Sequence, residues 1–290
     1  MQTTAMTLDA RLKDSELLYL LRQNPLTPLA ILMFLALVIA ALFGPWLAPH
    51  DPFASNTQDA LQSPSLTYWF GTDQLGRDIF SRVLVGARMD LGIALAAVLL
   101  ASSIGTLLGA IAGFVGGRTD QAIGRFTDII MAFPLFVLAM AIVAALGNSV
   151  ANVIYASAII NMPFYVRLVR GEVAVLRGAG FVEAARLCGN RNSRILWLHI
   201  MPSVMPALAV QMSLNMGWSM LNAASLSFIG LGIRPPSPEW GIMVADGAQY
   251  IISGQWWVAL FPGLALTLAV LCFNLLGDGL RDIIDPRQRK

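Results

Sequence analysis

The sequence has little charge for its length. Only 12% of its 290 residues are Asp, Glu, Lys or Arg, whereas 57% are apolar and the mean hydropathy is +0.67. A soluble domain carries about a quarter charged residues, so this chain cannot cover the surface of a soluble globule. The composition excludes soluble enzymes, disordered proteins and coiled coils, and it indicates a polytopic membrane protein.

Residues that bind metals or carry catalysis are also scarce. The chain has two cysteines, Cys188 and Cys272, and two histidines, His50 and His199, and none lies in a CxxC or HExxH motif. No GxSxG motif and no GxxxxGK[ST] phosphate-binding loop is present, and the net charge of +2 is too small to suggest a nucleic-acid partner. We therefore expect no catalytic residue, metal site or cofactor in this chain. Cys272 lies in an apolar run and is expected to be a small hydrophobic residue.

Long stretches without charged residues mark the expected membrane helices. A helix needs about 20 mostly apolar residues to cross a bilayer core of about 30 Å. Residues 129–166 are too many for one span, and Gly147-Asn148-Ser149 in their middle is typical of a turn. The sequence thus predicts six helices, at residues 29–47 and 91–117, two within 129–166, and at 205–228 and 247–277. The first is expected to be a retained anchor, and Trp256 and Trp257 to lie at the membrane interface.

Small residues form a stripe within the second expected span. Gly105, Gly109, Gly113 and Gly117 recur at every fourth position and so share one helix face. Such a face lets another helix backbone approach closely. The partner is either a helix of this same bundle or another subunit, and the sequence leaves both open.

The distribution of basic residues predicts the orientation of the chain. Lys and Arg are retained in cytoplasmic loops near the membrane. With the N-terminus inside, only Arg77, Arg82, Arg88 and Arg234 lie outside, and both termini are cytoplasmic. The other 15 of the 19 basic residues lie inside: Arg11, Lys13, Arg22, Arg118, Arg125, Arg167, Arg170, Arg177, Arg186, Arg191, Arg194, Arg281, Arg287, Arg289 and Lys290.

A secondary transporter or an intramembrane enzyme would need other residues in these spans. Coupling to protons or sodium normally uses ionisable side chains inside the membrane. The expected spans contain none apart from His199 and Asp278 at their margins, and we interpret His199 as a capping or interfacial residue. The chain also lacks a Ser/His or paired Asp arrangement for catalysis. Both classes are disfavoured.

The longest inside segment, residues 167–199, contains a helical pattern. Apolar residues recur there at three- and four-residue spacing, with Glu183 and Arg186 toward the charged side and Gly189 as a stop signal. This pattern predicts a short amphipathic helix, which either docks into a groove of a partner or is an ordinary solvated helix. Its apolar positions are Phe181, Ala184, Ala185 and Cys188.

At this segment the sequence resembles a known family. Glu-Ala-Ala, three residues, Gly, nine residues and x-x-x-Pro is similar to the EAA loop of ABC importer permeases, here at Glu183, Ala184, Ala185, Gly189 and Pro202. The family prefers aliphatic residues where this chain has a histidine at position 199 and a methionine at 201. Histidine at that position is common in the peptide and nickel branch. Residues 70–88, 226–241 and 261–287 also resemble C-type permeases of dipeptide, oligopeptide and nickel importers, so the resemblance runs from about residue 24 to 287.

The resemblance implies an all-α polytopic membrane protein with six transmembrane helices and the type I ABC importer (MetI-like) permease fold. It implies alternating access through two permease subunits, expected to form a heterodimer, driven by two cytoplasmic ATPase subunits that bind ATP and Mg. An extracytoplasmic substrate-binding protein would deliver the substrate, and the complex would lie in the bacterial inner membrane. The chain itself would be a transport subunit and not an enzyme.

The resemblance also implies which residues couple the permease to the ATPases. Small alanines permit close approach, the glutamate offers a charge to a basic partner residue, and the glycine lets the chain turn. Arg191 and Arg194 either pair with the partner as well or are simply solvated. The ATPase-coupling residues are expected to be Glu183, Ala184, Ala185, Arg186, Gly189, His199 and Pro202.

The two expected outer segments, residues 50–88 and 232–253, are where the binding protein would dock. Gly71, Gly76, Pro235 and Pro236 are interpreted as turn residues. The candidate contact residues are Asp73, Arg77, Asp78, Arg82, Arg234, Glu239 and Trp240.

We divide the chain into four parts. They are a cytoplasmic N-terminal segment (1–28), the first helix with its outer loop (29–88), the transmembrane core (89–280) with the coupling loop at 178–202, and a cytoplasmic tail (281–290). The expected substrate is a dipeptide or short oligopeptide. The alternative is nickel or another metal chelate, such as an opine metallophore, imported by the same fold.

Overall fold

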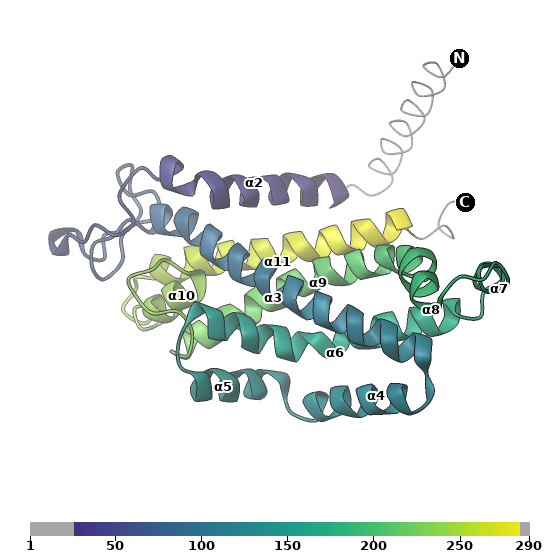
Figure 1. Cartoon of the computed structure of the whole chain (residues 1–290). Helices are drawn as coiled ribbons and strands as arrows, with labels where there is room; N and C mark the ends of the chain where they lie inside the picture. The colour runs from purple at the N-terminus through teal and green to yellow at the C-terminus, as the bar shows by residue number, and fades with distance from the viewer. Residues whose placement is uncertain (1–25, 285–290) are drawn as a thin grey trace, which may run out of the picture.

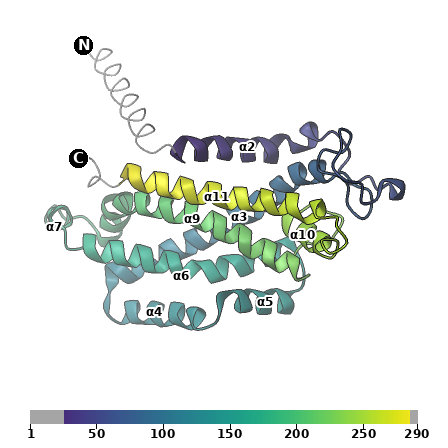
Figure 2. The ribbon, with the colours of Figure 1, turned by 180° about the vertical axis from the view of Figure 1, so that it is seen from behind.

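The computed structural model describes residues 26–284, and helices make up most of this part of the chain (Figures 1 and 2). The only β-type pairing in this range is an isolated bridge between Thr72 and Asp78. The predicted all-α architecture is confirmed. The elements are α2 (Leu26–Leu47), η1 (Thr57–Asp59), α3 (Ile79–Val115), α4 (Gly117–Met131), α5 (Leu135–Leu146), α6 (Val150–Leu176), α7 (Gly180–Leu187), α8 (Asn192–Arg194), the π-helical η2 (Ile195–Ile200), α9 (Met201–Phe228), α10 (Trp240–Ala248) and α11 (Trp257–Ile284).

Five helical stretches are long and apolar enough to cross a membrane, and a sixth crossing is possible if α4 and α5 form one broken span. These two helices are bent by 85° at the break. Of the two helices predicted within 129–166, the first is therefore not continuous, because α4 ends at Met131 and α5 begins at Leu135. Pro134 stands directly before α5 and cannot donate a backbone hydrogen bond, and the 12 residues of α5 reach only about 18 Å. The predicted turn at Gly147-Asn148-Ser149 is confirmed between α5 and α6.

Helix α3 begins at Ile79, well before the predicted start at residue 91. Asp78 caps its N-terminus, because its carboxylate accepts a hydrogen bond from the Ser81 N–H at 3.0 Å. The first turns contain Arg82 and Asp90, both buried, which a search for uncharged windows rejects. Asp90 is thus an ionisable residue of α3 that lies directly before the expected span at 91–117.

The glycine stripe of α3 packs inside the bundle. A Cβ atom built on Gly105 would lie 2.6 Å from the Tyr165 Cβ, and one on Gly109 or Gly113 would lie 2.6 Å from a carbonyl oxygen of α6. Side chains cannot occupy that space, so glycine at these positions allows α3 and α6 to touch. Gly105, Gly109 and Gly113 therefore contact a helix of the same bundle rather than another subunit. Gly117 lies in open space.

Substituting Gly109 should test this contact. Gly109→Ala places a methyl group against the Val166 carbonyl and is expected to lower the free energy of unfolding by about 1–3 kcal/mol. Gly92→Ala, on the same helix with no heavy atom within 4 Å of the new Cβ, is the matched control and should be close to neutral. Thermal unfolding of the purified protein measures both. Equal midpoints for the two variants would contradict close packing at Gly109.

The bundle has two distinct ends (Figures 1 and 2). The start of α2, the end of α11 and the protruding α7 lie at one end, and the loop after α2 lies with α10 at the other. Cys272 is buried and its thiol donates to the Ala30 carbonyl, as expected of a small core residue. Six residues used for the orientation lie outside the described part of the chain: Arg11, Lys13, Arg22, Arg287, Arg289 and Lys290.

Candidate functional site

Helix α7 is a short helix with well-formed ends. Glu183 in its first turn and Arg186 in its last turn both complement the helix dipole. At its C-terminus the Asn190 N–H donates to the Ala185 carbonyl at 3.2 Å, and the Gly189 N–H to the Arg186 carbonyl at 2.9 Å. This is the Schellman arrangement, which requires a left-handed residue, and Gly189 supplies it with φ of +75°. The predicted helix and its glycine stop are confirmed.

One side of α7 rests on the protein and the other is exposed. Val182 and Ala185 are buried, whereas Glu183, Ala184 and the neighbouring apolar residues point outward. The two alanines therefore differ: Ala185 packs inward, and only Ala184 is available to a partner. The exposed apolar set contains Phe181, Ala184, Leu187 and Cys188.

Leu187 was not among the predicted coupling residues. It is 90% exposed, and a large apolar side chain in this position at a helix tip is typical of an interaction surface.

The inner side of α7 packs against η2, which continues directly into α9. His199 lies on η2 with its side chain exposed, and Pro202 is one residue inside α9, as predicted for the start of that helix. Helix α7 is thus linked to α9 through η2. Arg177 ties the segment before α7 to the bundle, because its guanidinium donates to the Phe114 carbonyl at the end of α3.

Two groups of arginines at this end differ in whether they form ion pairs. Arg167 and Arg170 of α6 form ion pairs with Asp128 and Asp120 of α4, so they attach α4 to α6. The second group is exposed and belongs to none of the ion pairs found within residues 26–284; it comprises Arg186, Arg191 and Arg194.

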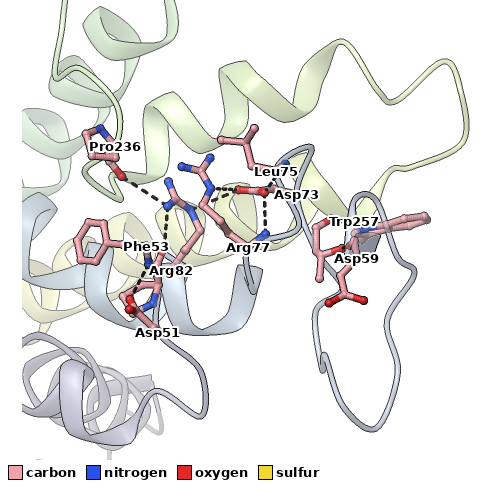
Figure 3. Close-up of polar contacts among 11 residues, drawn as sticks. Asp51, Phe53, Asp59, Asp73, Leu75, Arg77, Arg82, Pro236 and Trp257 are labelled. Carbon is pink, nitrogen blue, oxygen red and sulfur yellow. Dashed lines mark hydrogen bonds and ion pairs between the residues drawn. The ribbon is translucent and has the colours of Figure 1, made fainter. Parts of the chain in front are cut away.

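At the opposite end, the loop after α2 is organised around Asp73 (Figure 3). Its carboxylate lies 2.7 Å from the Arg77 Nε and 3.6 Å from the Arg82 Nε, and it also accepts the backbone N–H groups of Leu75 and Arg77. Arg82 in turn donates to the carbonyls of Pro52 and Pro236. Two segments more than 150 residues apart are thus held to the start of α3.

The buried position of these groups corrects the prediction for binding-protein contacts. Of the seven candidates, only Arg234 is exposed. The interpretation of Gly71 and Gly76 as turn residues is supported by φ of +74° and +73°. Trp257, expected at the membrane interface, is also buried, and its ring N–H donates to the Thr72 carbonyl. The residues wrongly offered as contact residues are Asp73, Arg77, Asp78, Arg82, Glu239 and Trp240.

The second outer segment is fastened to α3 by Trp240 and Glu239. The Trp240 backbone N–H donates to the Asp90 carboxylate at 3.1 Å, and its ring N–H to the Val83 carbonyl at 3.0 Å. Glu239 caps α10 by accepting the N–H groups of Gly241 and Ile242. Burial raises the pKa of the Glu239 carboxyl, and the two backbone donors oppose this rise.

Comparisons with known proteins match this architecture over nearly the whole chain. The family model "Binding-protein-dependent transport system inner membrane component" matches residues 105–290. The chain belongs to this family. The N-terminal TM domain of oligopeptide transport permease C matches residues 16–64 of this permease. The chain is therefore a membrane transport subunit rather than an enzyme, from a family that works with ATPase and substrate-binding partners.

Curated relatives cover almost all of the permease. It is 45% identical over 277 residues to the probable D,D-dipeptide transport system permease protein DdpC of Escherichia coli (strain K12), covering 96% of this chain and 93% of the relative. It is 44% identical to the dipeptide transport system permease protein DppC of Alkalihalophilus pseudofirmus, covering 93% and 88%. It is 47% identical to the glutathione transport system permease protein GsiD of Escherichia coli O6:K15:H31, covering 92% and 88%.

Proposed function

We propose that this permease imports dipeptides or short oligopeptides through alternating access, driven by ATP hydrolysis in two separate ATPase subunits. ATP and Mg bind to those subunits. The translocation pathway forms between this chain and a different, homologous permease subunit. An extracytoplasmic binding protein delivers the substrate to the end that carries α10, in the bacterial inner membrane.

One observation supports the coupling role of α7. The helix, which ends at the Gly189 turn, projects from the bundle and exposes an acidic and several apolar side chains. Glu183 and Ala184 face outward there, beside the 90% exposed Leu187. Ala185 supports the helix from within, and Arg186 adds a second charge. His199 and Pro202 lie on η2 and α9, where they would pass on the movement of α7 rather than bind the ATPase themselves.

The proposed orientation places α7 in the cytoplasm. The end of the bundle that carries α7 also carries the start of α2 and the end of α11 (Figure 1). An even number of crossings, with α4 and α5 as one broken span, agrees with that arrangement. The excess of arginine in the segments assigned to the inside supports it. The four-part division of the chain, with the transmembrane core at 89–280 and the coupling loop at 178–202, is proposed on the same basis.

The peptide substrate is supported by the relatives, whose names specify D,D-dipeptides, dipeptides and glutathione, all small peptides. Cells that lack the gene, and the same cells with the gene restored, test this. Uptake of a labelled dipeptide should disappear and return with the gene. Nickel uptake, measured in parallel, should not change. If nickel uptake falls while dipeptide uptake is unaffected, the peptide assignment is wrong and the metal-chelate alternative replaces it.

A further inference from the structure

Two carboxyl groups are buried together at the outer end of the bundle. Asp90 on α3 is 1% exposed and Glu239, directly before α10, is fully buried. Their side chains lie within hydrogen-bonding reach of each other, and the Ser227 hydroxyl of α9 is a further neighbour of Glu239. The pair therefore sits where α3, α9 and the start of α10 meet.

The hydrogen bonds around the pair leave one oxygen atom unused. Both Glu239 oxygens accept backbone N–H groups, from Gly241 at 2.9 Å and from Ile242 at 2.8 Å. Asp90 Oδ2 accepts the Trp240 N–H. Asp90 Oδ1 is buried and receives no hydrogen bond from any residue within 26–284. An unpaired buried carboxylate oxygen is costly, so this atom needs an explanation.

In the described part of the chain, no positive side chain forms an ion pair with either carboxyl group. Of the other charged residues nearby, Arg82 on α3 pairs with Asp73, Arg88 on α3 is exposed, and Asp246 on α10 is itself acidic. Two ionised carboxylates in contact and out of water would repel strongly, so one of them has to be neutral.

We propose that Asp90 and Glu239 form a proton-binding site, in which one shared proton fastens the start of α10 to α3 and keeps the outer end of the permease competent for transport. A metal ion is a poorer occupant, because no group of three possible ligands lies together in the part of the chain that the structure describes. The proton resides on Asp90 Oδ1 and is donated to Glu239. The negative charge remains on Glu239, where two N–H groups and the N-terminus of α10 stabilise it.

The direction of the pH dependence follows from the burial. Burial of both carboxyl groups disfavours the state with two negative charges, so the pair keeps its shared proton to a higher pH than a solvated carboxyl would and releases it as one unit. The stabilisation is complete below the ordinary pKa of a carboxyl and is lost as the pH rises through the raised pKa of the folded protein. Alkaline pH at the outer face therefore separates α10 from α3.

The test uses the full transporter in membrane vesicles, with the pH on the ATPase side held constant while the outer pH is raised. Once the outer pH exceeds the pKa of the shared proton, wild-type uptake should fall by up to about tenfold per pH unit. Asp90→Asn keeps an oxygen for the Trp240 N–H and donates its own N–H to Glu239 without a titratable proton. It should show a flat profile over the same range, and Glu239→Gln should do likewise. Asp246→Asn, a nearby carboxyl outside the pair, should retain the wild-type profile.

Two measurements need no substrate and separate this inference from the peptide proposal. The unfolding temperature of the purified complex should fall at alkaline pH in the wild type but not in Asp90→Asn. Infrared spectra of the wild type at neutral pH should contain a protonated carboxyl band that is missing in this variant. Identical pH profiles, or no such band in the wild type, would overturn the proton site. Absent dipeptide uptake, with these two differences intact, would instead overturn only the substrate.

Discussion

A permease with Glu183→Lys is expected to reach the membrane in normal amounts and to lose at least about tenfold in both uptake and ATPase binding. The side chain is exposed and belongs to none of the ion pairs described within residues 26–284, so its removal costs the fold little. In the complex its charge would meet a basic residue of the ATPase. Breaking such a pair costs about 2–5 kcal/mol, and lysine adds repulsion. Co-purification of the ATPase subunits with the tagged permease, together with uptake, measures the effect.

Two further variants show whether the loss is specific to α7. Gly189→Val forces a branched residue into the left-handed region, which costs about 1–2 kcal/mol and reorients the helix end. It should weaken coupling although no atom lies within 4 Å of the new Cβ. Arg125→Ala removes an exposed charge from α4 and should leave ATPase binding unchanged. Full uptake and normal ATPase binding in both α7 variants would contradict the proposal that α7 docks to the ATPase.

The membrane helices could be predicted where a continuous stretch of sequence is apolar enough to cross the bilayer by itself. A long uncharged run is costly to leave in water, so α2, α6, α9 and α11 follow from composition alone. The break between α4 and α5 could not be found in this way, because residues 129–146 are as apolar as a straight span and only Pro134 marks the bend. The start of α3 was missed because it contains buried charged residues, of which Arg82 pairs with Asp73 and Asp90 accepts the Trp240 N–H, both partners lying outside this helix.

The position of the proposed coupling helix α7 could be predicted from the sequence, but which of its residues face the bundle and which face outward could not. Spacing and the glycine stop located α7, but the spacing gave no means of telling that Ala185 faces inward while Ala184 and Leu187 face outward. The outer segments were harder. Charged residues in a loop are expected to be solvated, and the burial of Arg82 depends on Pro236, a residue 154 positions away. Such contacts come from the tertiary fold and leave no periodic signal.

The largest loss of stability is expected from Asp73→Ala. This substitution removes the carboxylate that forms ion pairs with the buried guanidinium groups of Arg77 and Arg82 (Figure 3). Removing one partner of a buried ion pair costs about 3–5 kcal/mol, because the remaining charge has neither water nor a counter-ion. The loop after α2 should detach from α3, and the permease should unfold at a markedly lower temperature and accumulate poorly in the membrane.

Asp51→Ala is the matched control in the same loop. Asp51 is exposed and its carboxylate accepts the neighbouring Phe53 N–H, so its loss should cost at most about 1 kcal/mol. The double variant Asp73→Ala/Arg77→Ala removes one charge of each sign and leaves Arg82 bonded to the Pro52 carbonyl. It should be more stable than the sum of the two single losses predicts, since the first substitution already breaks the shared ion pair. Strictly additive losses would mean that Asp73 acts through the loop backbone alone, by accepting the N–H groups of Leu75 and Arg77.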